Sequence, residues 1–304
     1  MRNNFFAEKH PMFELFFFLF VVIVSFLFFS LVSVLIAIPA FGLTLDTVFN
    51  VMQNTDDPLS LSFLKYMQVF QSISLFVIPP LVMAWFYGGD FKEKIGFVKV
   101  GNINLFVLVA LMMVSFIPFI NFLAELNSKF PLPEKIIERE MLGMELTEKL
   151  VHASTIPQLL FNLFMIAVIP AVGEELFFRN FLQKYLVRIT KNIHVGVILT
   201  AFVFSFLHFQ FLGFVPRFIL GLIFGYLFVW SGSIWISMVA HFVNNGLVVV
   251  VMYFISKGDI GKEIETVGAK PELLPVAVLS LMVGSSLLYV VYKHIKAKAA
   301  LAGE

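Results

Sequence analysis

The chain contains eight long apolar runs, and this feature constrains its fold more than any other. A helix needs about 20 apolar residues to cross the hydrocarbon core of a bilayer. The eight runs are Met12–Ala40, Leu61–Tyr87, Leu105–Leu126, Ile156–Tyr185, Val195–Leu212, Val215–Ser231, Trp235–Ile255 and Leu273–Val291. We therefore predict an all-α polytopic membrane protein, an eight-helix bundle in which residues 1–304 form one membrane-embedded domain.

The composition excludes a soluble domain. Hydrophobic residues make up 60% of the sequence and charged residues 13%, whereas a soluble domain carries about 25% charged residues. The net charge of +1 gives no reason to expect nucleic acid, so the expected surroundings are the lipid bilayer. The chain has no cysteine, which excludes disulfides and thiolate metal sites.

Basic residues between the runs predict the orientation, since cytoplasmic loops carry an excess of Lys and Arg. With the N-terminus inside, the inner segments carry Arg2, Lys9, Lys92, Lys94, Lys99, Lys184, Arg188, Lys191, Lys293, Lys296 and Lys298. The outer segments carry Lys129, Lys135, Arg139, Lys149, Lys257, Lys262 and Lys270. We predict cytoplasmic N- and C-termini. The first run exceeds the ~7–15 residues of a signal-peptide core, so we expect it to remain as a span.

The longest polar segment, residues 127–155, mixes Glu and Lys at helical spacing. This pattern is typical of a short amphipathic helix, which we expect at the outer face. A lid that gates access of substrate is the alternative interpretation of the same segment.

Three of the apolar runs contain polar side chains that lipid disfavours. These are Glu174, Glu175 and Arg179 in the fourth run, His208 in the fifth, and His241 and Asn245 in the seventh. One charge at the bilayer centre costs about 2.5–3.5 kcal/mol, so such groups are expected to have partners or a function. At 1.5 Å per residue, His208 is expected about halfway along its helix. We predict one shared site in the bundle interior, facing the cytoplasm.

Helical phase separates the two adjacent glutamates. Neighbouring residues lie about 100° apart around a helix, so Glu174 and Glu175 are not expected to face one point. Glu175 and Arg179 are four residues apart, which suits an ion pair. Glu174 then remains as the carboxylate without a local partner. The spacing predicts that Glu175 is held by Arg179 and that Glu174 is free to act.

The same spacing pairs residues on the other two helices. Phe204 lies four residues before His208, and His241 lies four residues before Asn245. A single His or Asn inside a membrane often serves only as a hydrogen-bonding contact between helices. A whole set on three helices, with one unpaired acid, favours a functional site.

The three spaced motifs together resemble the CPBP family, the CAAX proteases and bacteriocin-processing enzymes that are also called the Abi family of intramembrane proteases. The motifs are Glu174-Glu175-x-x-x-Arg179, Phe204-x-x-x-His208 and His241-x-x-x-Asn245. The type II CAAX prenyl endopeptidase belongs to this family. The resemblance covers a core at residues 156–251, matches the eight expected spans, and implies hydrolysis of a peptide bond inside the membrane, open to the cytoplasmic side.

The chemistry of such a site assigns a role to each residue. Hydrolysis needs an activated water and donors for the developing oxyanion. We assign Glu174 as general base, His208 as the residue that orients the water, and His241 with Asn245 as oxyanion donors. Glu175, Arg179 and Phe204 are expected to support these four residues.

A zinc-dependent protease is the alternative mechanism, because two histidines and a carboxylate can also ligate catalytic zinc. Glu174, His208 and His241 would then be the ligands. These residues come from three helices and lack the compact His-Glu-x-x-His spacing, and Asn245 is a poor zinc ligand. We therefore favour a mechanism that requires no cofactor.

Other functions use the same residues differently. A transporter with a proton relay is one alternative, although internal repeats typical of transporters are not evident. A catalytically idle scaffold or immunity protein is another, but an idle site has no reason to keep all four catalytic residue types. The expected substrate is a peptide or membrane-associated protein, and the expected location is a prokaryotic inner membrane. No oligomeric state is predicted.

Overall fold

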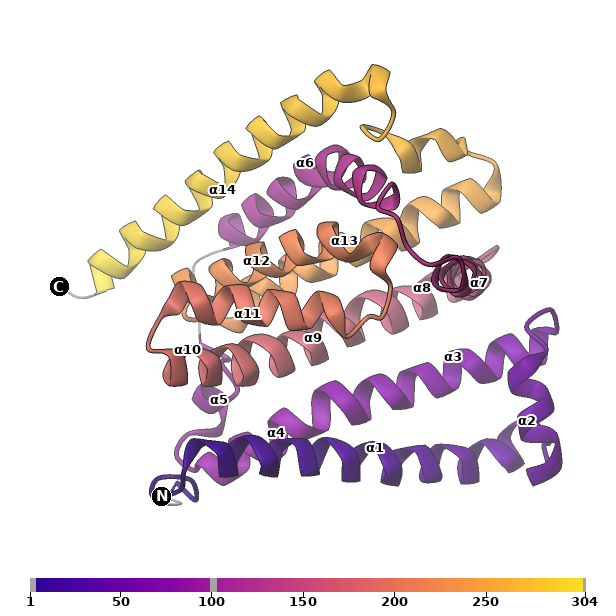
Figure 1. Cartoon of the computed structure of the whole chain (residues 1–304), viewed down its shortest axis with the longest axis horizontal. Helices are drawn as coiled ribbons and strands as arrows, with labels where there is room; N and C mark the ends of the chain where they lie inside the picture. Colours follow the sequence, from indigo (N-terminus) through magenta and orange to yellow (C-terminus); the bar gives the residue numbers. More distant parts are fainter. Residues whose placement is uncertain (1–3, 99–102, 303–304) are drawn as a thin grey trace.

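All regular secondary structure in the described part of the chain is helical, as Figure 1 shows. The computed structural model describes residues 4–98 and 103–302, so Arg2 and Lys99 of the orientation pattern lie outside it. Within these residues, seven helices are long and apolar enough to cross a membrane. They coincide with seven of the eight runs expected from the sequence.

The N-terminal third forms an antiparallel helical hairpin, drawn in indigo and purple in Figure 1. Its elements are α1 (Pro11–Phe41), α2 (Leu45–Gln53), α3 (Pro58–Ser72), the π-helical segment η1 (Ile73–Val77), α4 (Ile78–Tyr87) and α5 (Phe91–Lys94). Gly42 ends α1 with a φ of 64°, a left-handed conformation that glycine adopts without steric cost. Asp57 starts α3 by accepting a hydrogen bond from the Ser60 backbone N–H.

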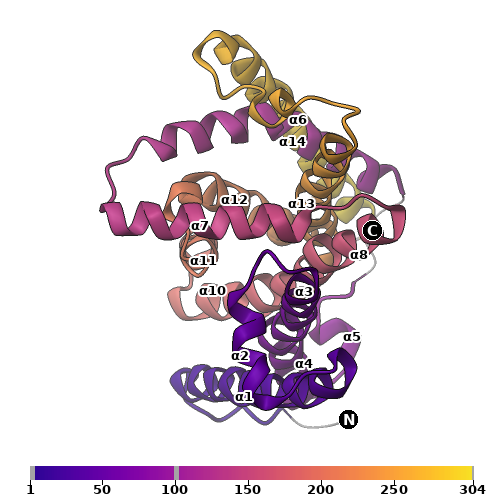
Figure 2. The ribbon, with the colours of Figure 1, turned by 90° about the vertical axis from the view of Figure 1, so that its right-hand side faces the viewer.

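A second antiparallel pair lies on the opposite side of the bundle (Figure 1). It consists of α6 (Ile103–Ser128) and α14 (Leu274–Ala302), which begins after the 3₁₀ segments η5 (Lys262–Thr266) and η6 (Pro271–Leu273). The polar segment between α6 and the next span forms α7 (Glu134–Val151). Figure 2 shows α7 lying across one end of the bundle, over α11, α12 and α13.

The fourth run forms one helix of 35 residues, Ile156–Thr190. It divides into α8 (Ile156–Leu163), η2 (Phe164–Val168), α9 (Ile169–Glu174), η3 (Glu175–Gln183) and α10 (Lys184–Thr190), of which η2 and η3 are π-helical. π-Helical turns inside α-helices are rare and occur frequently at functional sites. The junction of α9 and η3 falls between Glu174 and Glu175.

Three further helices complete the core around the fourth run. They are α11 (Ile193–Phe206), α12 (Phe214–Ser231), preceded by the 3₁₀ turn η4 (Phe211–Gly213), and α13 (Ile234–Lys257). α11 and α12 approach closely at Gly221, where an added Cβ would lie 3.1 Å from the Cα of Ala201. α11 and α12 therefore pack with their backbones in close contact.

The fifth predicted span is shorter than the sequence suggested. α11 has 14 residues and ends at Phe206, so the prediction that His208 lies halfway along a helix is wrong. Phe209 has a φ of 51°, which is incompatible with a continuing helix. His208 therefore lies in the connection between α11 and α12, near one end of the bundle.

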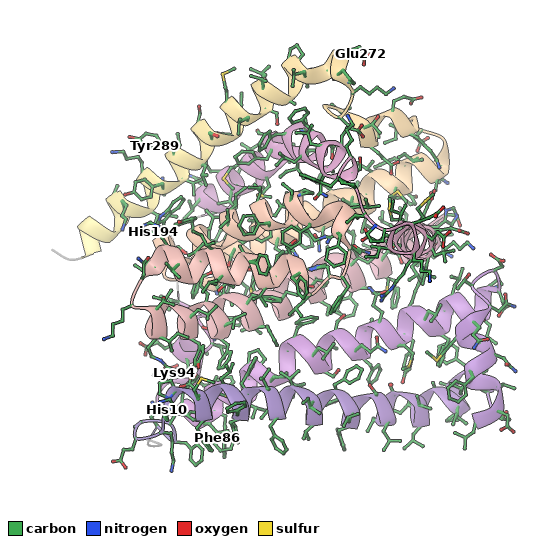
Figure 3. All side chains as sticks on the ribbon, viewed as in Figure 1. His10, Phe86, Lys94, His194, Glu272 and Tyr289 are labelled. Carbon is green, nitrogen blue, oxygen red and sulfur yellow. The ribbon has the colours of Figure 1, made fainter. Side chains whose placement is uncertain are left out.

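The two ends of the bundle are formed by different elements. The N- and C-termini, α5 and the α10–α11 turn lie at the left-hand end of Figure 1, whereas α2, α7 and the α11–α12 connection lie at the other. The labelled side chains of Figure 3 agree, with His10, Lys94 and His194 at the first end and Glu272 at the second. We refer to these as the terminal end and the α7 end.

This arrangement predicts that Glu8 and Glu138 face opposite sides of the membrane. The chain has no cysteine, so Glu8→Cys and Glu138→Cys each introduce one reactive thiol at an exposed position. In sealed vesicles, we expect a membrane-impermeant maleimide to label one variant from outside and the other only after permeabilisation. Labelling of both from the same side would contradict the arrangement.

Candidate active site

An ion pair buried inside the bundle forms the base of the site. The Nε of Arg179 lies 3.1 Å from Oε2 of Glu175, and both side chains are 0% exposed. The spacing in the sequence predicted this pair. Arg179 also donates from Nη2 to the Gly221 carbonyl oxygen at 3.3 Å. Because each charge is compensated within the protein, neither has to reach water or lipid headgroups.

Aromatic rings surround the guanidinium group of Arg179. Its central carbon lies 4.7 Å from the Phe204 ring centroid, 5.4 Å from that of Phe224 and 5.9 Å from that of Phe178. The faces of aromatic rings attract cations at these distances. Phe204 thus does more than the sequence indicated, since its ring contacts Arg179 as well as His208, at 5.1 Å between ring centroids.

Glu175 has a second contact that sequence reasoning missed. Its Oε1 lies 2.9 Å from Nδ1 of His241, whose ring stacks on Phe224 with centroids 5.0 Å apart. The Glu175 carboxylate accepts from Nδ1–H of His241, and in this neutral tautomer Nε2 is the acceptor. A carboxylate that orients a histidine in this way is common in catalytic sites.

Asn245 contacts the other nitrogen of the same imidazole. Its Nδ2 lies 3.3 Å from Nε2 of His241 and donates to the Ile166 carbonyl oxygen at 3.0 Å. Asn244, which was not assigned a role from the sequence, donates to Oδ1 of Asn245 at 3.1 Å. The expected pairing of His241 with Asn245 is therefore present, and Asn244 and Ile166 orient the Asn245 amide.

Glu174 approaches His241 from the side opposite Glu175. Its Oε2 lies 3.9 Å from Nε2 of His241 and is buried without a hydrogen-bond partner among the described residues. The sequence analysis expected Glu174 and Glu175 not to face one point. This expectation is wrong, because both carboxylates approach the imidazole ring of His241. The two carboxylates reach opposite nitrogens of one imidazole, because α13 packs against the α9–η3 junction where the winding of the helix changes.

His208 lies at the edge of this group. Its Nδ1 is 2.7 Å from the Phe204 carbonyl oxygen, which makes Nδ1 the donor and leaves Nε2 free to accept. Within the described residues, His208 forms no hydrogen bond or ion pair with Glu174, His241 or Asn245. The Phe204 ring connects them instead, since its centroid lies 6.0 Å from that of His241.

The geometry does not assemble a metal site. Among the described residues, no group of three or more His, Asp or Glu side chains is arranged to hold one metal ion. Nδ1 of His241 is bonded to Glu175, which leaves only Nε2 of this ring for any other ligand.

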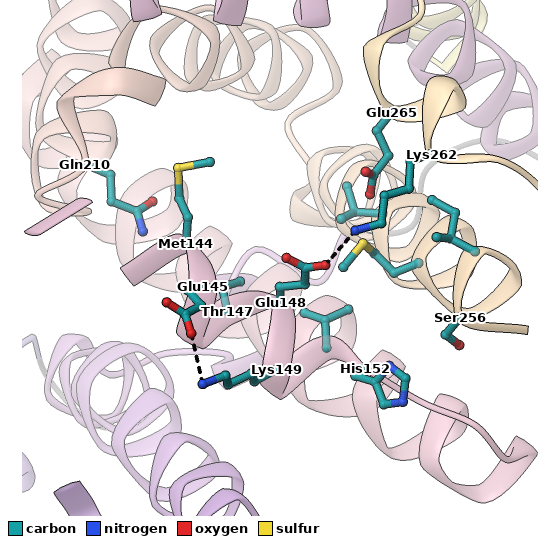
Figure 4. A pocket seen from close by; sticks show the side chains of 14 residues that line it. Met144, Glu145, Thr147, Glu148, Lys149, His152, Gln210, Ser256, Lys262 and Glu265 are labelled. Atoms are coloured by element: carbon teal, nitrogen blue, oxygen red, sulfur yellow. Dashed lines mark hydrogen bonds and ion pairs between the residues drawn. The ribbon is translucent and has the colours of Figure 1, made fainter. Parts of the chain in front are cut away.

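Three cavities lie at the α7 end, next to the polar residues of the candidate site. The largest, with a volume of about 880 Å³, lies between α7 and α13 and is lined by Gln210, His152, Val248 and charged residues of α7 and η5. Figure 4 shows Lys262 paired with Glu148, and Lys149 with Glu145, at its rim. A smaller cavity of about 390 Å³ reaches Asn244. Glu174, His208 and His241 do not line these cavities, which end at the neighbouring Gln210 and Asn244.

Arg217 lines the two smaller cavities, whereas the sequence suggested only that its side chain extends to the outer membrane interface. Its Nη1 donates to the Gln210 carbonyl oxygen at 3.0 Å and its Nη2 to Oε1 of Gln210 at 2.7 Å. The side chain is therefore directed into the bundle, towards the connection that carries His208. A lone arginine near His208 in an apolar run was the only signal available in the sequence.

Comparison with known proteins supports the class that this geometry indicates. A family model described as type II CAAX prenyl endopeptidase Rce1-like matches residues 156–247. The predicted resemblance to this family is thereby confirmed for a segment that contains all three motifs, and residues 1–155 and 248–304 lie outside the match. The chain is an integral membrane protein whose matched segment is similar to CAAX-type intramembrane proteases. Neither the curated proteins nor the solved structures contain a match to the chain.

The buried ion pair predicts a large loss of stability when one partner is removed. Glu175→Ala leaves the guanidinium of Arg179 uncompensated inside the bundle, which typically costs about 3–5 kcal/mol. We expect this loss in the free energy of unfolding, measured by titration with a denaturing detergent in micelles.

The matched control is Glu125→Ala. Glu125 forms an ion pair of the same spacing with Lys129, but these side chains are 42% and 60% exposed, so the expected loss is below about 1 kcal/mol. Equal losses for the two variants would contradict a special role of the buried pair.

Proposed function

We propose that the protein is an intramembrane endopeptidase that hydrolyses a peptide bond with water activated by Glu174. One observation carries the proposal: a buried carboxylate oxygen without a hydrogen-bond partner lies 3.9 Å from a histidine that a second carboxylate orients. A free acid beside an oriented imidazole suits proton transfer.

In the proposed mechanism, Glu174 takes a proton from the water that attacks the substrate carbonyl carbon. His208 accepts a hydrogen bond from this water at its free Nε2 and thereby orients it. Glu174 then returns the proton to the leaving nitrogen of the peptide bond. Each of these steps needs only side chains of α9 and of the α11–α12 connection.

His241 and Asn245 stabilise the oxyanion of the tetrahedral intermediate. Neutral His241 is an acceptor at Nε2, because its Nδ1–H donates to Glu175. When a proton from solvent is bound at Nε2 before the substrate enters, the imidazole donates it as a hydrogen bond to the oxyanion, while Nδ1–H stays bonded to Glu175. The Asn245 amide, now bonded to Nε2 and to the Ile166 carbonyl, turns one N–H towards the oxyanion in the same step.

The substrate enters from the α7 end, where the cavities approach Gln210 and Asn244. We propose that α11, together with the connection to Gln210, completes the eighth helix of the bundle and forms one wall of this entry. The termini and these cavities lie at opposite ends of the bundle, which supports a change to the orientation expected from the sequence. We propose that the site opens on the side of the membrane away from the termini.

The proposal is tested by cleavage of a quenched fluorescent peptide library, with and without a prenyl-like lipid, by purified protein in detergent. We expect Glu174→Gln to lower kcat/KM by at least about a hundredfold, the usual contribution of a general base. Glu138→Gln, an exposed acid on α7, is the matched control and is expected to match the wild type.

A metal chelator in the same assay separates the mechanisms. We expect no change in the wild-type rate, because no step uses a metal. Loss of activity that zinc restores would replace the proposed mechanism with the zinc-dependent one. Full activity of Glu174→Gln would exclude Glu174 as the base, and a wild type that cleaves no peptide would favour an idle scaffold or immunity protein.

A further inference from the structure

The connection between α11 and α12, residues 207–213, carries His208 next to a residue with an unusual backbone conformation. Phe209, the next residue, has a φ of 51°, in the left-handed region that residues with a side chain rarely adopt. Such a conformation persists only where surrounding contacts enforce it. The contacts on both sides of Phe209 therefore determine where His208 points.

The strongest of these contacts comes from Glu140 of α7. Its Oε1 accepts from the Phe211 backbone N–H at 2.6 Å, and its Oε2 accepts from the Leu212 N–H at 2.8 Å. Glu140 is only 5% exposed, in contrast to the exposed Glu138 on the same helix. Hydrogen bonds from two amides to one ionised carboxylate are short and strong.

Two further side chains tie the same connection to the bundle. Asn127, at the end of α6, donates to the Phe211 carbonyl oxygen at 2.8 Å and accepts from the Val215 N–H at 2.6 Å. Arg217 binds Gln210 as described above. All six hydrogen bonds of these three side chains reach positions within seven residues after His208. The His208 ring is itself held by the Phe204 carbonyl oxygen.

We propose that Glu140 is a positioning residue for His208. By holding the Phe211 and Leu212 amides, its carboxylate keeps the turn at Phe209 in the left-handed conformation that directs His208 towards the site. The inference rests on the proposed function, since it assigns to His208 the orientation of the water. In this proposal, α7 contributes to the site through Glu140, although α7 itself lies outside the core of the bundle.

The test compares Glu140→Gln with Glu138→Gln. Gln keeps the shape of Glu140 but loses the charge and presents an N–H to one of the two amides, so one hydrogen bond is lost. We expect kcat to fall about tenfold, as the loss of one charge-assisted hydrogen bond implies, with KM within about twofold. Glu138→Gln is expected to leave both constants unchanged.

A second variant separates positioning from a general loss of stability. Phe209→Gly removes the steric cost of the left-handed turn, because glycine adopts positive φ readily. In the double variant Glu140→Gln/Phe209→Gly, we expect part of the lost kcat to return. A merely destabilised protein would lose further activity when the Phe209 side chain is also removed.

Hydrogen exchange supplies a readout that does not depend on catalysis. In Glu140→Gln, the amides of residues 207–213 should exchange about tenfold faster, because their opening loses the same hydrogen bond. Unchanged exchange, or an unchanged kcat in an active enzyme, would overturn the inference. A wild type that cleaves nothing would refute the proposed function instead, which keeps the two failures distinct.

Discussion

The buried ion pair between Glu175 and Arg179 is the interaction on which the rest of the site depends. A lone charge at this depth would be unstable, and removal of one partner leaves such a charge. The pair also holds the carboxylate of Glu175 in place, and this carboxylate orients His241 at Nδ1. Without Arg179, the carboxylate that selects the histidine tautomer would lose the guanidinium that holds it.

The fourth membrane helix is unusual because its winding changes at the site. The two glutamates lie on either side of the boundary between α9 and the π-helical η3. One carboxylate is committed to the ion pair while its neighbour keeps an unpaired oxygen. Adjacent residues of identical chemistry thus acquire different environments, and environment decides which carboxylate acts as a base and which as a support.

The sequence predicted the main features of the fold, because apolar length and i, i+4 spacing are local properties. Among the described residues, seven helices of spanning length coincide with predicted apolar runs, and Glu175 pairs with Arg179 as the spacing indicated. The prediction failed where the chain leaves regular geometry. The turn at Phe209 ends the fifth helix early, and nothing in the apolar run around it indicated that end.

The sequence by itself determined that this is a helical membrane protein with Glu, His and Asn side chains in three of its apolar runs. Only the tertiary structure decided which atoms meet. The contact of Glu175 with His241, and that of Glu140 with the connection after His208, join residues 66 and more than 70 positions apart. Such contacts depend on the rotation and depth of each helix against its neighbours, which packing sets and which no local pattern encodes.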